Sequence, residues 1–151
     1  HTIGRRQRQM CIRDSYHSSL LGIWLMLATI FFQAMVAITA HFRQDGGYVP
    51  GVIKPDLDQS SFVFRTHRTF QNSLENIIPL LGMSFLAMFS GYSPLKLSIV
   101  VWIYALARII HMILYYKIVA KRNPSPRSIP WTIGFLAGLY FMIDLGVHLV
   151  L

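Results

Sequence analysis

The chain has 151 residues, of which 54% are hydrophobic and 13% charged, and its mean hydropathy is +0.46. A soluble domain carries roughly 25% charged residues, so this composition argues against a soluble monomer and for one membrane domain. The single cysteine excludes a disulfide framework and any cysteine-based zinc or iron–sulfur site. A net charge of +8 would suggest nucleic acid as the partner of a soluble protein, but here the apolar content favours the lipid bilayer.

The first 15 residues are interpreted as a non-native leader, because their composition differs from that of the rest. Four of the 14 Lys and Arg residues lie there, without the apolar stretch that a signal peptide requires. The run RRQRQMCIRDS resembles translated adapter sequence, and a genuine basic tail is the alternative. Without the leader, 10 basic and 5 acidic residues remain and the net charge is still +5. The predicted domain is therefore residues 16–151.

Long uncharged segments predict four membrane-spanning helices. Residues 16–42 contain no Asp, Glu, Lys or Arg, and about 20 apolar residues of helix suffice to cross the hydrocarbon core. Three further segments follow, at about 67–91, 95–116 and 128–151, and the breaker cluster SGYSP separates the first two of these. A soluble bundle would show a polar stripe on each helix, which these segments lack. The expected fold class is an all-α integral membrane protein, a four-transmembrane-helix bundle.

The Lys and Arg residues of the connections predict the orientation of these spans. The first and third connections hold most of them: Arg43, Lys54, Arg65, Lys117, Lys121, Arg122 and Arg127. The second connection has only Lys96. We therefore expect the first and third connections to face the cytoplasm, with both termini on the far side of a membrane such as the bacterial inner membrane. The first connection carries GG, VPG and KPD turn signals and is expected to fold over the mouth of a site.

Two polar rows inside the predicted spans carry the candidate chemistry. Arg68, Asn72 and Glu75 follow at helical spacing and share one face. The third span has a similar row, Tyr104, Arg108, His111 and Tyr115. Charges inside a span are costly unless they are paired or face a wet cavity, so the rows should meet, with Glu75 and Arg108 as an ion pair. Asp144, in the fourth span, is expected to make a polar contact with another helix.

These charges favour a small zwitterionic ligand. An apolar substrate alone needs no arginine cluster, whereas a ligand with two carboxylates and one ammonium needs several arginines and an acid. Glutathione fits, because arginine binds carboxylates through two donors and Glu75 can accept from the ammonium. An arginine near the sulfur would also favour the thiolate. The same charges admit other small anionic ligands.

The segment VFRTHRTFQNSLENIIPLL, residues 63–81, resembles the signature of the MAPEG family, the membrane-associated proteins of eicosanoid and glutathione metabolism. The family pattern Arg-x-x-Arg-x-x-x-Asn-x-x-Glu-x-x-Pro is met by Arg65, Arg68, Asn72, Glu75 and, one position late, Pro79. ARIIHMILYY in the third span and PRS at 126–128 resemble segments of the microsomal prostaglandin E synthase branch. The resemblance covers about residues 20–151.

The resemblance implies a homotrimer with glutathione bound between neighbouring subunits, near the cytoplasmic face. The glutathione-binding residues that it implies are Arg43, Arg68, Asn72, Glu75, Arg108, His111 and Tyr115. Arg127 resembles the arginine that stabilises the thiolate, and Ser128 resembles the adjacent hydroxyl, the alternative activator. Gln71 and Trp131 stand where the prostaglandin synthase branch has Arg and Tyr. These departures weaken the case for prostaglandin isomerisation more than the case for glutathione binding.

Three classes of function remain open. The first is a glutathione S-transferase or peroxidase of the membrane, acting on lipophilic electrophiles or hydroperoxides that arrive through the bilayer. The second is a non-catalytic MAPEG-type lipid-binding or scaffold protein. The third is a small multidrug transporter of four spans, whose expected lone carboxylate in the first span is missing here.

Several of these residues also have purely structural interpretations. Arg43 and the basic residues of the third connection fit boundary charges of a membrane protein, and Arg108 with Glu75 fits a structural ion pair. His111 fits a hydrogen-bonded core residue, and no second His or carboxylate lies one helical turn from it to complete a metal site. His67, Tyr116 and Trp131 fit interfacial anchors.

Overall fold

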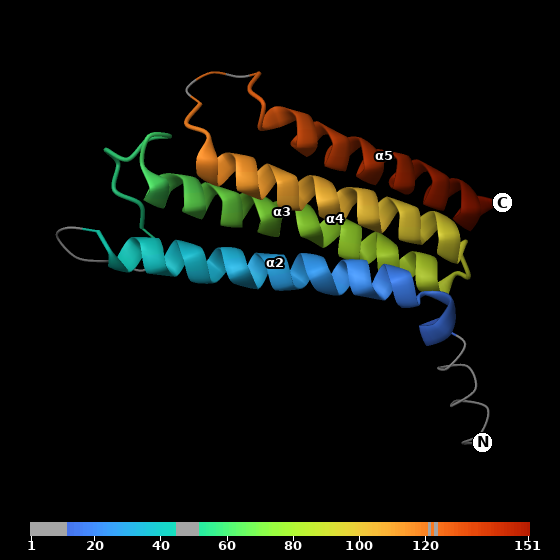
Figure 1. Ribbon diagram of the computed structural model, residues 1–151. Coiled ribbons are helices and arrows are strands. Elements are labelled where there is room, and N and C mark those ends of the chain that lie inside the picture. Colours follow the sequence, from blue (N-terminus) through green and yellow to red (C-terminus); the bar gives the residue numbers. More distant parts are fainter. Residues whose placement is uncertain (1–11, 45–51, 121, 123) are drawn as a thin grey trace.

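The computed structural model describes residues 12–44, 52–120, 122 and 124–151, and four long helices form an antiparallel bundle in them (Figure 1). The helices are α2 (His17–Phe42), α3 (Phe62–Phe89), α4 (Pro94–Lys117) and α5 (Ser128–Val150). Helices α3 and α4 lie between α2 and α5. Most of the predicted leader (residues 1–11), the GG and VPG turn signals and Lys121 lie outside the described residues.

Three of the helices, α2, α4 and α5, are long and apolar enough to cross a membrane. Helix α3 is not among them, because its first half carries the polar row that begins at Arg68. This helix also begins at Phe62, earlier than the expected residue 67. The reason is Arg65, whose Nη1 donates to the carbonyl oxygens of Gln59 and Ser60 at 2.8 and 2.7 Å and so ties the polar first turn to the preceding loop.

The turn between α3 and α4 follows directly from its residues. Gly91 has φ +72°, the left-handed conformation that glycine adopts without strain. The amide of Tyr92 then donates to the carbonyl oxygen of Ala87 at 2.9 Å, the bond that closes a Schellman motif. Helix α4 begins with Pro94 after Ser93, whose hydroxyl accepts from the amide of Lys96. The two helices therefore run antiparallel.

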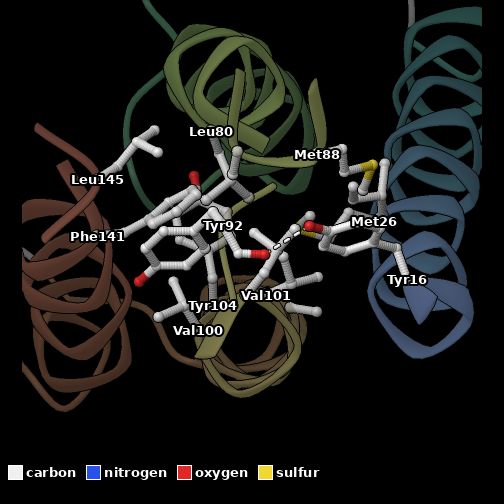
Figure 2. Close-up of a cluster of buried hydrophobic side chains, with 14 of the residues drawn as sticks. Tyr16, Met26, Leu80, Met88, Tyr92, Val100, Val101, Tyr104, Phe141 and Leu145 are labelled. Atoms are coloured by element: carbon white, nitrogen blue, oxygen red, sulfur yellow. Dashed lines mark hydrogen bonds between the residues drawn. The ribbon is translucent and has the colours of Figure 1, made fainter. Parts of the chain in front are cut away.

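The core lies where all four helices meet (Figure 2). Its largest buried side chains include Met26, Leu80, Tyr92, Val101, Tyr104 and Phe141. Tyr16 completes the core near the start of α2, and its hydroxyl donates to the carbonyl oxygen of Tyr92.

Asp144 has two partners at the end of the bundle that holds the α3–α4 turn. The Nζ atom of Lys96 lies 3.0 Å from its Oδ2, and the hydroxyl of Tyr92 donates to the same oxygen. Burial and this hydrogen bond raise the pKa of Tyr92. The polar contact expected for Asp144 is therefore present, and it joins α5 to the start of α4.

The outer surface of the bundle is apolar along its length. Exposed side chains of α5 include Ile133, Leu136, Tyr140, Ile143 and Val147. Those of α2 include Trp24, Phe31, Met35 and Ile38. An apolar surface of this size is unfavourable in water, and we expect lipid or a neighbouring protein to cover it. The structure therefore agrees with the membrane setting expected from composition.

Candidate active site

A cavity of about 670 Å³ opens at the end of the bundle where α4 ends and α5 begins. Pro124 and Pro126 keep the connection between these helices out of helical conformation. Arg127 occupies the N-cap position of α5 without a capping hydrogen bond from its side chain. The side chains that line the cavity include Gln59, His111, Tyr115, Arg127, Ser128 and Trp131. The cavity thus combines four of the nine residues predicted from the sequence: His111, Tyr115, Arg127 and Ser128.

Arg127 is a buried cation held in a fixed orientation. It is 5% exposed, and its Nη1 donates to Oε1 of Gln59 at 3.0 Å. Its Nη2 donates to the carbonyl oxygen of Ala120 at 2.9 Å, and its Cζ lies 4.2 Å from the ring centre of Tyr115. Among the described residues its Nε has no hydrogen-bond partner. The guanidinium therefore brings a full positive charge to the wall of the cavity.

The cavity wall on α4 adds two further polar side chains. His111 is buried, its ring centre lies 5.4 Å from that of Tyr115, and within the described ranges its Nδ1 has no partner. The hydroxyl of Tyr115 accepts from Nε2 of Gln59 at 3.0 Å. No three His, Cys, Asp or Glu side chains of the described chain are grouped so that they could hold a metal ion. The cavity is built of hydrogen-bond donors and suits an anionic ligand.

The two polar rows do meet, but the predicted ion pair between Glu75 and Arg108 is wrong for the single chain. Arg108 is buried, and its Nη2 donates to Oδ1 of Asn72 at 2.6 Å and to Oγ of Ser73 at 3.4 Å. Glu75 is exposed and pairs with no cation of the described residues. The physical reason is the helical turn: Glu75 is displaced around α3 relative to Asn72, so only the amide faces α4.

The remaining predicted residues do not reach the cavity within one chain. Arg43 and Arg68 are exposed, and Arg68 makes one long contact, 3.5 Å from its Nη1 to Oε1 of Gln71. Glu75 borders a separate apolar groove of about 390 Å³ between α3 and α5. Eight of the nine predicted residues therefore form two groups, four around the cavity and four made up of the polar face of α3 and its partner Arg108, and Arg43 lies apart from both at the end of α2.

Sequence reasoning missed Gln59 and Ser73. Gln59 lies in the loop before α3, where no periodicity marks a residue as facing inward, yet it contacts both α4 and the start of α5. Ser73 is adjacent to Asn72, and its contact with Arg108 follows only from the packing of α3 on α4. A polar residue in a loop that is rich in turn signals was the only available hint for Gln59.

Residues 19–147 match the model of the MAPEG family, nearly the whole length of the chain. The chain belongs to the MAPEG family. No curated protein and no solved structure matches it significantly. The resemblance to this family is thereby confirmed, and the three apolar helices indicate that this MAPEG protein is a multi-pass membrane protein. Membership points to a membrane function related to glutathione or eicosanoids.

Proposed function

We propose that this MAPEG protein is a glutathione S-transferase of the membrane, and that Arg127 stabilises the glutathione thiolate in the cavity between α4 and α5. The observation that carries the proposal is the buried, oriented guanidinium of Arg127 in the wall of the cavity that His111 also lines. Among the described residues, Nε of Arg127 and Nδ1 of His111 are both buried without a hydrogen-bond partner. Buried polar atoms without partners are uncommon in proteins and call for a ligand or water. A cluster of donors around one cation fits a thiolate and carboxylates.

Different side chains of the cavity are proposed to bind glutathione and to activate its thiol. Bound glutathione supplies a thiol whose deprotonated sulfur forms a bond to an electrophilic carbon, from which a leaving group departs with the bonding electron pair. With a hydroperoxide the sulfur instead takes the terminal oxygen as the O–O bond breaks and an alcohol leaves, and a second glutathione then reduces the sulfenic acid to give glutathione disulfide and water. Arg127 favours the deprotonated form, because a nearby positive charge lowers the pKa of a thiol. The hydroxyls of Tyr115 and Ser128 supply further hydrogen bonds, and Ser128 is the alternative activator. The apolar surface of α5 lets lipophilic substrates approach from the bilayer.

The site is proposed to be completed by a neighbouring subunit of a homotrimer. Arg68 and Glu75 are exposed in one chain, although the resemblance places both in the family signature. Exposed charges on a helix of a membrane bundle need protein or water beside them. A second copy that places this face of α3 next to the cavity would supply an arginine for a carboxylate of glutathione and an acid for its ammonium. Arg43, at the end of α2, is proposed for the same role as Arg68.

Glutathione binding by the purified protein in detergent tests the proposal. We expect saturable binding with the ultraviolet absorption of a thiolate at neutral pH, and cross-linking to a trimer. S-methylglutathione, which has no thiol, is the matched control: it should bind without the thiolate signal. Absence of binding, or binding of glutathione only as the thiol, would contradict the proposal.

One observation favours a second function, a non-catalytic lipid-binding protein. The groove between α3 and α5 is lined mainly by apolar residues, including Leu80, Met83, Phe135 and Leu139. A lipid chain fits such a groove without any arginine chemistry. This alternative predicts that a fatty acid binds with equal affinity in wild-type protein and in Arg127→Ala, and that neither protein turns over glutathione.

A further inference from the structure

Gln59 joins three parts of the chain at the mouth of the cavity. Its Oε1 accepts from Nη1 of Arg127, its Nε2 donates to the hydroxyl of Tyr115, and its carbonyl oxygen accepts from Nη1 of Arg65. These three contacts come from the start of α5, from α4 and from α3. The side-chain amide of a loop residue is thus held at both ends, by Arg127 and by Tyr115.

The chemistry of the partners fixes the direction of each hydrogen bond. Arginine has donors only, so the atom of Gln59 that faces Arg127 must be the amide oxygen. The atom that faces Tyr115 is then the amide nitrogen, which only donates. The hydroxyl of Tyr115 therefore accepts this bond and keeps its own proton for another acceptor. Among the described residues no acceptor for that proton is found, and Tyr115 lines the cavity.

We infer that Gln59 is a positioning residue, which directs the hydroxyl proton of Tyr115 into the cavity as a donor to an anion and holds Arg127 beside it. The inference rests on the proposed function for the identity of that anion, the glutathione thiolate. Gln59 is inferred to act through these two side chains. The neutral amide of Gln59 does not accept the hydroxyl proton of Tyr115 and does not neutralise the charge of Arg127. Both groups can therefore still interact with an anion in the cavity.

The isosteric change Gln59→Glu separates positioning from simple structural support. A carboxylate accepts from both neighbours, so it turns the proton of Tyr115 away from the cavity and neutralises Arg127 in an ion pair. Besides Tyr115 and Arg127, the charged or titratable groups near this amide among the described residues include Arg65, His111, Arg122 and the adjacent Asp58. We expect Gln59→Glu to fold with an unchanged or higher melting temperature. We also expect turnover of glutathione to fall at least about tenfold at neutral pH and the pH–rate profile to move to higher pH.

Two variants serve as controls. Ser61→Asp adds the same charge two positions later, at the start of α3, where an acid is favourable, and should leave turnover and the pH profile unchanged. Gln59→Leu removes both hydrogen bonds without adding charge and should lower the melting temperature, with a smaller loss of turnover than Gln59→Glu. Full turnover and an unshifted pH profile in Gln59→Glu would overturn the inference.

A measurement on the free protein keeps this test separate from that of the proposed function. With 13C-labelled tyrosine, the Cζ signal of Tyr115, identified by its loss in Tyr115→Phe, should shift in Gln59→Glu and stay in place in Ser61→Asp. This shift is expected whether or not glutathione binds. An unmoved signal would overturn the inference on Gln59, whereas a shifted signal in a protein that does not bind glutathione would overturn the proposed function alone.

Discussion

Arg127 shows how a single residue can be both oriented and reactive. Two carbonyl oxygens, the amide of Gln59 and the ring of Tyr115 surround its guanidinium, so its position is set before a ligand arrives. Preorganised charge of this kind stabilises an anion without further rearrangement. The consequences for catalysis and for stability are separable by mutation.

Arg127→Ala is expected to cut turnover of glutathione at neutral pH by at least about tenfold, since one unit of thiol pKa is worth about 1.36 kcal/mol. Loss of the cation raises the pKa of the bound thiol, so activity should return in part as the pH rises and the thiolate forms unaided. Steady-state kinetics across the pH range measure both effects.

Lys117→Ala is the matched control for this substitution, because it removes an exposed cation from the same end of α4. It should leave turnover and its pH dependence unchanged. Full activity in Arg127→Ala, together with loss of activity in Ser128→Ala, would assign activation of the thiol to the hydroxyl instead.

Asn72 is expected to couple to Arg108 in a double-mutant cycle, and Glu75 is not. Removing the amide in Asn72→Ala leaves a buried guanidinium without its closest acceptor, at a cost of about 2 kcal/mol in the free energy of unfolding. Arg108→Met should remove most of that cost, so the double variant loses less than the sum. Denaturant unfolding in detergent without glutathione measures the coupling. Additive losses for Asn72 and Arg108, or strong coupling between Glu75 and Arg108, would contradict this prediction.

The sequence correctly predicted which helices contact each other, but not always which side chains make the contact. Helical spacing correctly predicted that Arg108 faces α3, because the periodicity identifies which side chains share one face of a helix. It could not choose between Asn72 and Glu75, which share that face but point in different directions. Gln59 could not be predicted as a site residue, because a loop has no periodicity that shows which side chains point inward.

Helices α2 and α4 approach closely at Gly22. A Cβ atom built on this glycine would lie 2.6 Å from Cγ1 of Val101, a fully buried and branched side chain with no room to move. Gly22→Ala is therefore expected to lower the free energy of unfolding by about 1–3 kcal/mol through overpacking. Chemical unfolding in detergent, followed by helical circular dichroism, measures the loss.

Gly146→Ala is the control, because nothing lies within 4 Å of the added carbon in α5. Alanine has the better helix propensity, so stability should stay the same or rise by up to about 1 kcal/mol. Val101→Ala should restore part of the loss in Gly22→Ala, since it removes the clashing methyl group. No loss in Gly22→Ala would mean that α2 and α4 pack farther apart than described.

Helix ends were predictable where the chain carries its own stop and start signals. Gly91 and Pro94 mark the end of α3 and the start of α4 almost to the residue. The start of α3 was expected too late, because the sequence around Ser61 and Arg65 looks polar and loop-like. Only the contacts of Arg65 with the preceding carbonyl oxygens explain why helix begins there.

The two ends of the whole molecule differ in charge. The cavity with Arg127 lies at the end shared by the first and third connections, and the other end holds the α3–α4 turn (Figure 1). At that other end the basic residue of the turn region, Lys96, is paired with Asp144. Among the described residues from 16 onward, the Lys and Arg residues other than Lys96 lie closer to the end of the bundle that holds the proposed site. Because both α4 and α5 contribute to the ion pair, it also fastens the end of α5 to the bundle.

This asymmetry predicts the orientation in the membrane. Lys and Arg residues near the ends of spans remain on the cytoplasmic side, and an ion pair with Asp144 reduces the pull of Lys96 toward that side. We therefore expect the proposed site to open to the cytoplasm and the end of α5 to lie on the far side. An alkaline phosphatase fused after Leu151 should be active in a bacterial host. A green fluorescent protein at the same position should stay dark.

The same reporters inserted after Arg122, in the third connection, are the internal control and should give the reverse pattern. Asp144→Asn frees the charge of Lys96, so it should shift part of the population toward the opposite orientation, whereas Tyr92→Phe, which leaves the ion pair in place, should not. A fluorescent fusion after Leu151 in the unchanged chain would show that the end of α5 is cytoplasmic. The cavity would then open on the side of the membrane opposite the cytoplasm. Cytoplasmic glutathione could not reach it directly, so both the predicted orientation and the proposed access of glutathione would be wrong.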